Sequence, residues 1–169
     1  MTDTPTVLFL CIHNSGRSLA ARVLLDHYAQ GRIRVESAGS EPGEALNPSV
    51  VAVLKERGLD VSKDFPKPLA DETARAADVI VTMGCGDTCP VYPGKRYLDW
   101  ELNDPAGKPI DQVRPIIDDI DGRVRALLND LIRWVAPSSL CSPPADDGDA
   151  PERPHSPVTP SIDSRIRSA

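Results

Sequence analysis

The sequence predicts an α/β domain with a parallel sheet and helices on both of its faces. Short apolar runs, which are typical of buried strands, alternate along the chain with segments of helical period. Alternation of this kind in one small domain favours a parallel sheet covered by helices. A chain of 169 residues is long enough for one such domain and too short for two.

The first part of the chain is expected to hold two strands with a helix between them. Residues 7–11 form a continuous apolar run, which predicts a buried strand. A helix is expected over 16–30, because apolar residues recur at spacings of three and four and Gly31 stands where a C-terminal cap is expected. Residues 33–37 alternate in polarity and predict the second strand.

The middle of the chain is expected to hold two more helices and the third strand. Asn47 offers an N-cap, Pro48 suits the first helical position, and Gly58 ends that helix. A short helix is expected over 71–77, and it leads into a third buried strand over 78–82.

The domain, which we place at residues 1–136, ends with a short fourth strand over 95–98 and a long amphipathic helix. One apolar stripe identifies this helix, and it consists of Ile116, Ile120, Val124, Leu127, Leu128, Leu131 and Val135. Residues 137–169 hold seven of the 17 prolines and none of the aromatic residues. Their scattered apolar side chains cannot bury enough surface to offset the entropy of ordering, so we expect a disordered tail rich in proline and serine.

Composition excludes several classes of protein. The net charge is −6 and the pI is about 5.0, which argues against a nucleic-acid binder that would need an excess of cations. The apolar run over 7–12 is far too short to span a membrane, and it lacks the flanks of a signal peptide. We therefore expect a cytoplasmic protein, in which four cysteines indicate chemistry or metal binding before structural disulfides.

The segment over 11–18 carries the clearest chemical signal. A short loop between a buried strand and a helix start turns its backbone N–H groups inward and makes an anion cradle. Cys11, at the first position, is expected to be a thiolate nucleophile, and Ser18 is placed to donate a hydrogen bond to its sulfur. Arg17 can direct its planar guanidinium at the same anion. Asn14 tolerates the left-handed backbone that so tight a loop often needs.

The residues expected to bind the anion follow the nucleophile directly, and they are Ile12, His13, Asn14, Ser15, Gly16 and Arg17. A cysteine six residues before an arginine is by itself a weak pattern, and the alternative is a buried cysteine beside an arginine that pairs with a surface acid. The predicted strand before the loop and the helix after it favour the cradle.

This loop resembles the phosphate-binding loop of the low-molecular-weight protein tyrosine phosphatase family. The stretches 36–39, Asn47-Pro48 and 104–108 are similar to the arsenate reductase branch of that family, the type coupled to thioredoxin, and the similarity covers roughly residues 6–135. The resemblance implies an open, flavodoxin-like sheet of four parallel strands. It also implies that Cys11 is the nucleophile, Arg17 the oxyanion ligand, Ser18 the thiolate stabiliser and Asp104 the general acid.

Two further positions leave alternatives open. A carboxylic acid such as Asp104 could protonate the leaving oxygen, but an aspartate before proline is also typical of a simple Asx turn. Cys85 and Cys89 could form a redox relay, in which each in turn attacks a sulfur and a Cys85–Cys89 disulfide remains for an external thiol to reduce. A bystander pair is the bland alternative, and two cysteines alone cannot complete a zinc site.

The resemblance and the relay pair together predict a cytoplasmic, thioredoxin-dependent arsenate reductase. It would act as a monomer without a bound cofactor, and phosphate or sulfate would compete with arsenate. No metal is expected: two cysteines cannot complete a zinc site, and Arg22 stands where relatives carry the glutamate of a potassium site. The alternatives are a phosphatase that hydrolyses phosphate monoesters, a mycothiol-linked arsenate transferase, and an inactive module that only holds phosphate.

Overall fold

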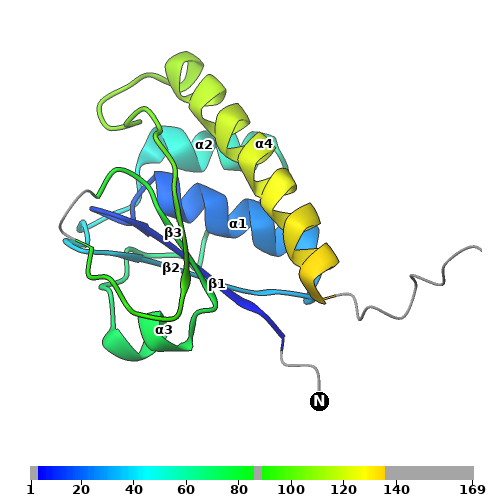
Figure 1. Cartoon of the computed structure of the whole chain (residues 1–169). Helices are drawn as coiled ribbons and strands as arrows, with labels where there is room; N and C mark the ends of the chain where they lie inside the picture. The colour runs from blue at the N-terminus through cyan, green and yellow to red at the C-terminus, as the bar shows by residue number, and fades with distance from the viewer. Residues whose placement is uncertain (1–3, 86–88, 136–169) are drawn as a thin grey trace, which may run out of the picture. The chain divides into compact units, whose positions relative to one another are not determined.

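The computed structural model describes residues 4–85 and 89–135. The predicted tail over 137–169, with Cys141, lies outside the described residues. Four parallel strands form one sheet in the order β2-β1-β3-β4, which is the strand order of a flavodoxin-like sheet (Figure 1). The strands are β1 (Thr6–Cys11), β2 (Arg34–Gly39), β3 (Val79–Thr82) and β4 (Arg96–Asp99).

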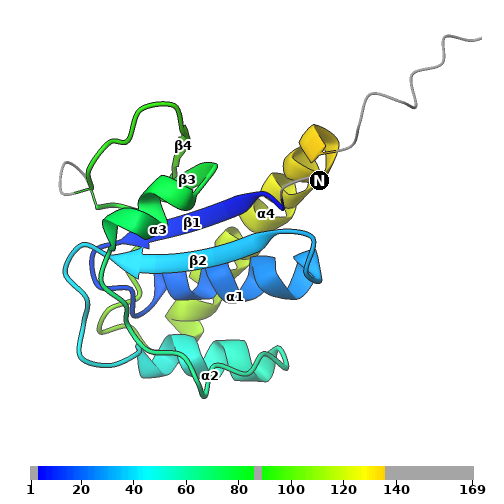
Figure 2. The same ribbon diagram turned by 90° about the horizontal axis from the view of Figure 1, so that it is seen from below.

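Helices cover both faces of the sheet, as predicted (Figure 2). The helices are α1 (Arg17–Ala29), α2 (Pro48–Glu56), α3 (Asp71–Ala76) and α4 (Ile110–Val135). Helices α1, α2 and α4 pack on one face of the sheet, and the short α3 packs on the other. The apolar cluster on the first face is therefore much the larger of the two. Among the described residues, no helix is both long enough and apolar enough to cross a membrane.

The strands divide their side chains between two apolar clusters. Val7 and Phe9 of β1 point into the larger cluster beneath α1 and α4, where the ring of Phe9 lies 5.7 Å from that of Trp100. Leu8 and Leu10 point into the smaller cluster beneath α3. All four strand residues are fully buried, as a run that is apolar at every position predicts.

The predicted elements are all present, with small differences at their ends. β2 continues past the predicted end at Ser37 to Gly39, because it pairs with β1 until Cys11 and Gly39 face each other. Gln30 rather than Gly31 is the C-cap of α1, and it takes the left-handed conformation with φ 50°. α4 begins at Ile110, six residues before the first residue of the predicted stripe.

Strand pairing brings the chemically interesting segments to one edge of the sheet. Leu10 pairs with Thr82, and the Met83 N–H donates to the Leu10 carbonyl over 2.8 Å. The chain beyond β3 therefore runs beside the loop that follows Cys11. This is the edge at which open parallel sheets bind ligands.

Candidate active site

The loop between β1 and α1 is held from outside by the segment over 40–47. Four backbone N–H groups of that segment donate to loop carbonyls: Ser40 to Cys11 at 3.2 Å, Glu41 to Ile12 and Gly43 to His13 at 2.9 Å, and Asn47 to Ser15 at 2.8 Å. The carbonyls thus find their partners away from the loop's interior. This arrangement keeps these carbonyls turned away from the interior of the loop, where the predicted cradle needs N–H groups.

The sulfur of Cys11 receives two contacts from this loop and its helix. The Ser18 hydroxyl lies 2.8 Å from Sγ, and the Asn14 N–H donates to Sγ over 3.2 Å. Cys11 is 3 % exposed, and Asn14 has φ 51°, which confirms the predicted left-handed conformation. The sulfur thus has two hydrogen-bonding partners inside the site.

The Asn14 side chain determines which way the Ser18 hydroxyl points. The Lys67 backbone N–H donates to Asn14 Oδ1 over 2.9 Å, and this contact sets the orientation of the amide. Asn14 Nδ2 then donates to Ser18 Oγ over 2.7 Å. Because Ser18 Oγ accepts that hydrogen, its own hydrogen is free for Cys11. A chain of hydrogen bonds thus runs from the backbone of Lys67 through Asn14 and Ser18 to the sulfur of Cys11.

Arg17 and Asp104 face each other across the same site. The guanidinium is largely buried, and Nη2 lies 3.6 Å from Oδ2 of the half-exposed Asp104 side chain. Asp104 also accepts a hydrogen bond from the Ala106 N–H over 3.1 Å, so the Asx turn that was the alternative interpretation is present. The turn and the approach to Arg17 coexist. The turn itself orients the carboxylate.

A small pocket joins these groups. It is lined by Cys11, His13, Ser15, Gly16, Arg17, Asn47, Asp104, Pro105 and Ala106. Of the six residues predicted to bind the anion, Ile12 and Asn14 do not line this pocket. The Ile12 side chain packs on the cluster beneath α3, and Asn14 is buried at 1 % exposure.

Three lining residues were missed by the sequence analysis as site residues. Pro105 and Ala106 follow the predicted acid, and Asn47 was interpreted only as the first cap of α2. The sequence did offer a signal for Asn47, because Asn47-Pro48 is one of the stretches that resemble the arsenate reductase branch of the family.

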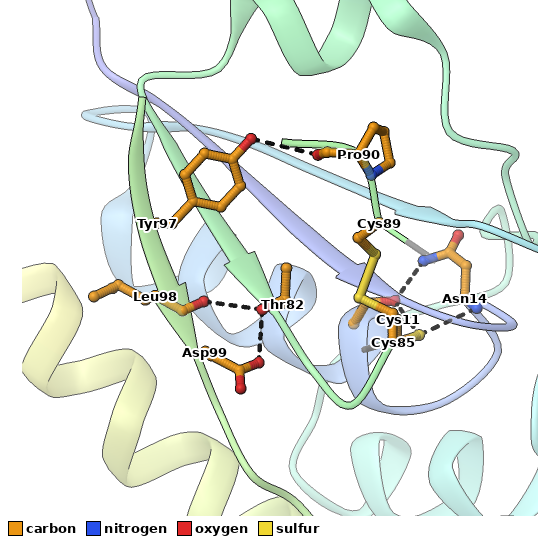
Figure 3. The surroundings of a disulfide bond; sticks show 10 residues. Cys11, Asn14, Thr82, Cys85, Cys89, Pro90, Tyr97, Leu98 and Asp99 are labelled. Atoms are coloured by element: carbon orange, nitrogen blue, oxygen red, sulfur yellow. Dashed lines mark hydrogen bonds between the residues drawn. A yellow bond between two sulfur atoms is a disulfide. The ribbon is translucent and has the colours of Figure 1, made fainter. Parts of the chain in front are cut away.

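Cys85 and Cys89 form a disulfide, with their Cα atoms 6.0 Å apart. Figure 3 shows the pair at the edge of the sheet where Cys11 ends β1. Cys11 is the free cysteine within the described part of the chain. This pairing is the end state of the predicted relay. Both residues are buried, however, at 3 % and 8 % exposure, whereas an external thiol that reduces this disulfide must reach one of its sulfur atoms.

The burial of the disulfide has a local cause. Cys85 and Cys89 belong to the small cluster beneath α3, in which Tyr92 and Tyr97 also pack. The Tyr97 hydroxyl accepts from the Tyr92 N–H over 2.6 Å. It also donates to the Pro90 carbonyl over 3.5 Å (Figure 3). The segment that leaves Cys89 is therefore fastened to β4.

A further bond ties the same segment to α3. The Tyr92 hydroxyl donates to Asp71 Oδ1 over 2.8 Å. Hydrogen bonds from Arg75 and then Tyr92 lower the pKa of Asp71, and the same contact with Asp71 raises the pKa of Tyr92. An ionised Asp71 thus stabilises the position of Tyr92.

The described residues hold no group of three or more His, Cys, Asp or Glu side chains suited to a metal ion. Arg22 pairs with Asp64 at 2.5 Å between Nη2 and Oδ1, and both side chains are 17 % exposed. The positive charge that pairs with the Asp64 carboxylate here is therefore the guanidinium of Arg22.

Comparisons with known proteins agree on one family. The profile described as low molecular weight phosphotyrosine protein phosphatase matches residues 6–136. An arsenate reductase from Brevibacillus brevis is 32 % identical over 74 % of this chain and 95 % of its own length.

Two solved structures give the same picture. A thioredoxin-dependent arsenate reductase from Corynebacterium glutamicum is 49 % identical, with a TM-score of 0.67 over 77 % of this chain; the match spans 62 % of that protein's length. An arsenate reductase from Archaeoglobus fulgidus is 35 % identical, with a TM-score of 0.62 over 73 % of this chain and 98 % of its own.

Proposed function

Because the chain belongs to the low-molecular-weight phosphotyrosine protein phosphatase family, we propose that it uses the family's cysteine cradle to reduce arsenate to arsenite. The observation that carries this proposal is the Cys85–Cys89 disulfide at the same sheet edge as the free Cys11. A phosphatase needs the cradle alone. A reductase also needs two further thiols to take up the oxidising equivalents. The names of the relatives support the same reaction.

The first step uses the cradle. The Cys11 thiolate attacks the arsenic atom of hydrogen arsenate and forms a sulfur–arsenic bond, while the arsenic–oxygen bond to the hydroxyl group breaks and that oxygen takes a proton from Asp104 and leaves as water. Arg17 and the loop N–H groups hold the remaining oxygens. The two contacts to Cys11 Sγ, from Ser18 and Asn14, support the thiolate before the attack.

The relay then carries out the reduction. The Cys85 thiolate attacks the Cys11 sulfur, and the electron pair of the sulfur–arsenic bond passes to arsenic, which leaves as arsenite. The resulting Cys11–Cys85 disulfide is attacked by Cys89 at the Cys85 sulfur, which expels the Cys11 thiolate. The product is the Cys85–Cys89 disulfide with Cys11 free, which matches the pairing in the structure.

An external dithiol completes the cycle, and we assign this role to thioredoxin. Cys89 is the more exposed of the paired cysteines, at 8 % against 3 %, and Val91 beyond it is 80 % exposed. A protein thiol can approach from this side once the segment after Cys89 moves away from Tyr97. The enzyme would work in the cytoplasm, where such dithiols are kept reduced, as a monomer with phosphate or sulfate as competing anions.

The decisive experiment follows NADPH consumption in the presence of thioredoxin reductase, thioredoxin, arsenate and the protein. Sustained turnover is expected, and it should disappear in Cys89→Ser. Cys141→Ser is the matched control, because it removes a thiol to which the relay assigns no role, and it should keep full activity. Replacing thioredoxin and its reductase with mycothiol or glutathione, each supplied with its own NADPH-dependent reductase, tests the choice of reductant.

The opposite result would assign a different function. If NADPH is not consumed with any of these thiols while an aryl phosphate is hydrolysed rapidly, the protein is a phosphatase. Cys85→Ser would then leave ester hydrolysis unchanged. If neither reaction occurs but Arg17→Ala abolishes phosphate binding, the cradle is a binding module.

A further inference from the structure

Asn47 bonds to both loops that form the pocket. Its backbone N–H donates to the Ser15 carbonyl over 2.8 Å, and its side-chain Nδ2 donates to the Pro105 carbonyl over 3.2 Å. Ser15 lies in the cradle, and Pro105 is the residue directly after Asp104. One residue thus spans the part of the site that holds the anion and the part that carries the acid.

The direction of the Asn47 amide is determined by its place at the start of α2. Oδ1 accepts from the Ser49 and Val50 N–H groups over 3.0 and 3.2 Å, which is the usual bonding of an N-cap. With Oδ1 turned toward the helix, Nδ2 points the other way and meets Pro105. The cap and the tether therefore use opposite ends of one side chain.

The two loops also touch through Gly16. A Cβ atom at Gly16 would lie 2.9 Å from Pro105 Cγ, which is closer than real Cβ contacts come. Ser49 adds a second tether farther along, because its hydroxyl donates to the Lys108 carbonyl over 3.0 Å. The peptide next to Asp104 is thus packed and hydrogen-bonded, although the Asp104 side chain itself is 54 % exposed.

We propose that Asn47 is a positioning residue for the reaction, which holds the general acid Asp104 beside the cradle through the Nδ2 bond to Pro105. The proposal rests on the proposed function, in which Asp104 protonates the leaving oxygen. A general acid works only within hydrogen-bond reach of the oxygen it protonates. A small displacement of an exposed loop aspartate is therefore expected to slow the chemical step without weakening anion binding.

The test uses Asn47→Ser. Serine caps helices about as well as asparagine, and the backbone bond to Ser15 does not depend on the side chain, so the substitution removes chiefly the tether to Pro105. The rate of arsenite release is measured in a single turnover of the pre-reduced enzyme, which needs no external reductant. We expect this rate to fall about tenfold, since general acids contribute roughly 10²- to 10⁴-fold and a misplaced acid keeps part of that.

Two further measurements separate positioning from a structural role. Phosphate, measured as a competitive inhibitor, should keep its inhibition constant within about twofold, because the cradle is unchanged. In an Asp104→Asn background, Asn47→Ser should have almost no further effect on the rate, since the acid that it positions is already gone. The thermal midpoint should stay close to that of the unmodified protein.

Each alternative result has a definite meaning. If Asn47→Ser slows both backgrounds equally, or raises the inhibition constant of phosphate in parallel, Asn47 acts on the cradle and the inference is wrong. If Asp104→Asn slows the reaction but Asn47→Ser does not, the inference fails and the proposed function stands. If Asp104→Asn has no effect, the acid role fails first.

Discussion

Gly84 lies directly against the guanidinium of Arg17: a Cβ atom at position 84 would lie 2.8 Å from Nη1. The backbone there has φ +71°, a conformation that residues other than glycine rarely adopt. Gly84 is also the residue immediately before Cys85. The backbone that leads into the disulfide therefore forms one wall of the position taken by Arg17.

This contact predicts that Gly84→Ala weakens oxyanion binding, because the added methyl group displaces the guanidinium. We expect the inhibition constant of phosphate to rise about tenfold, in line with a charge-assisted hydrogen bond made less well. Gly94→Ala is the matched control: Gly94 has φ +79° and nothing within 4 Å of its Cβ position. It introduces the same backbone strain without touching Arg17. Equal inhibition constants in the two variants would contradict the argument.

The hydrogen bonds to the Cys11 sulfur predict that Ser18 increases its reactivity toward alkylating reagents. Ser18→Ala removes the hydroxyl 2.8 Å from Sγ and leaves the Asn14 N–H as the remaining donor of the two. We expect alkylation by iodoacetamide at pH 7 to slow about tenfold, because the thiolate is the reactive form. The measurement uses the oxidised protein in a Cys141→Ser background, where Cys11 is the remaining free thiol.

A surface serine provides the control for this experiment. Ser62 lies in an exposed loop, so Ser62→Ala should leave the alkylation rate unchanged. A Ser18→Ala rate equal to that of the parent protein would show that the hydroxyl does not support the thiolate.

The fold could be predicted from local patterns, whereas much of the support around the site could not. The apolar run of β1 and the Asn-Pro start of α2 act within a few residues, so they are visible in the sequence. The Asn47 contact with Pro105 joins residues 58 positions apart. The contact of Gly84 with Arg17 likewise depends on how β1 and β3 pair. Cys89 is buried in a cluster against which Tyr97 of β4 packs, a contact that depends on the fold.

The bond from Tyr92 to Asp71 predicts a pH-dependent term in stability. The pKa of Asp71 is lowered in the folded chain, by hydrogen bonds from Arg75 first and Tyr92 second. Its contribution to the free energy of unfolding is therefore complete above the ordinary aspartate pKa and is lost as the pH falls through the lowered value. Asp71→Asn should lower the thermal midpoint at pH 7.

The same comparison at lower pH checks the sign. The difference between Asp71→Asn and the parent protein should shrink as the pH falls below the ordinary aspartate pKa and vanish once it lies below the lowered pKa of Asp71, where both side chains are neutral. Thermal unfolding followed by circular dichroism between these limits is the measurement. A difference that stays constant across the range would mean that ionisation of Asp71 plays no part.

The two paired cysteines are not equivalent in their surroundings, and this predicts their order in the relay. Cys85 directly follows Gly84, which lies against the Arg17 guanidinium, so Cys85 lies beside the cradle. Cys89 is the more exposed of the two. We therefore expect Cys85 to attack the Cys11 sulfur and Cys89 to receive the attack of the external dithiol.

Trapping each intermediate tests this order. Pre-reduced Cys89→Ser should release one arsenite per protein and then stop with a Cys11–Cys85 disulfide, because the thiol that would resolve it is missing. Cys85→Ser should release none, since the thiol that attacks the Cys11 sulfur is then missing. Non-reducing peptide mapping by mass spectrometry identifies the bonds. A Cys11–Cys89 disulfide with release of arsenite in Cys85→Ser would reverse the order, and the exposed end of the relay would then be Cys85.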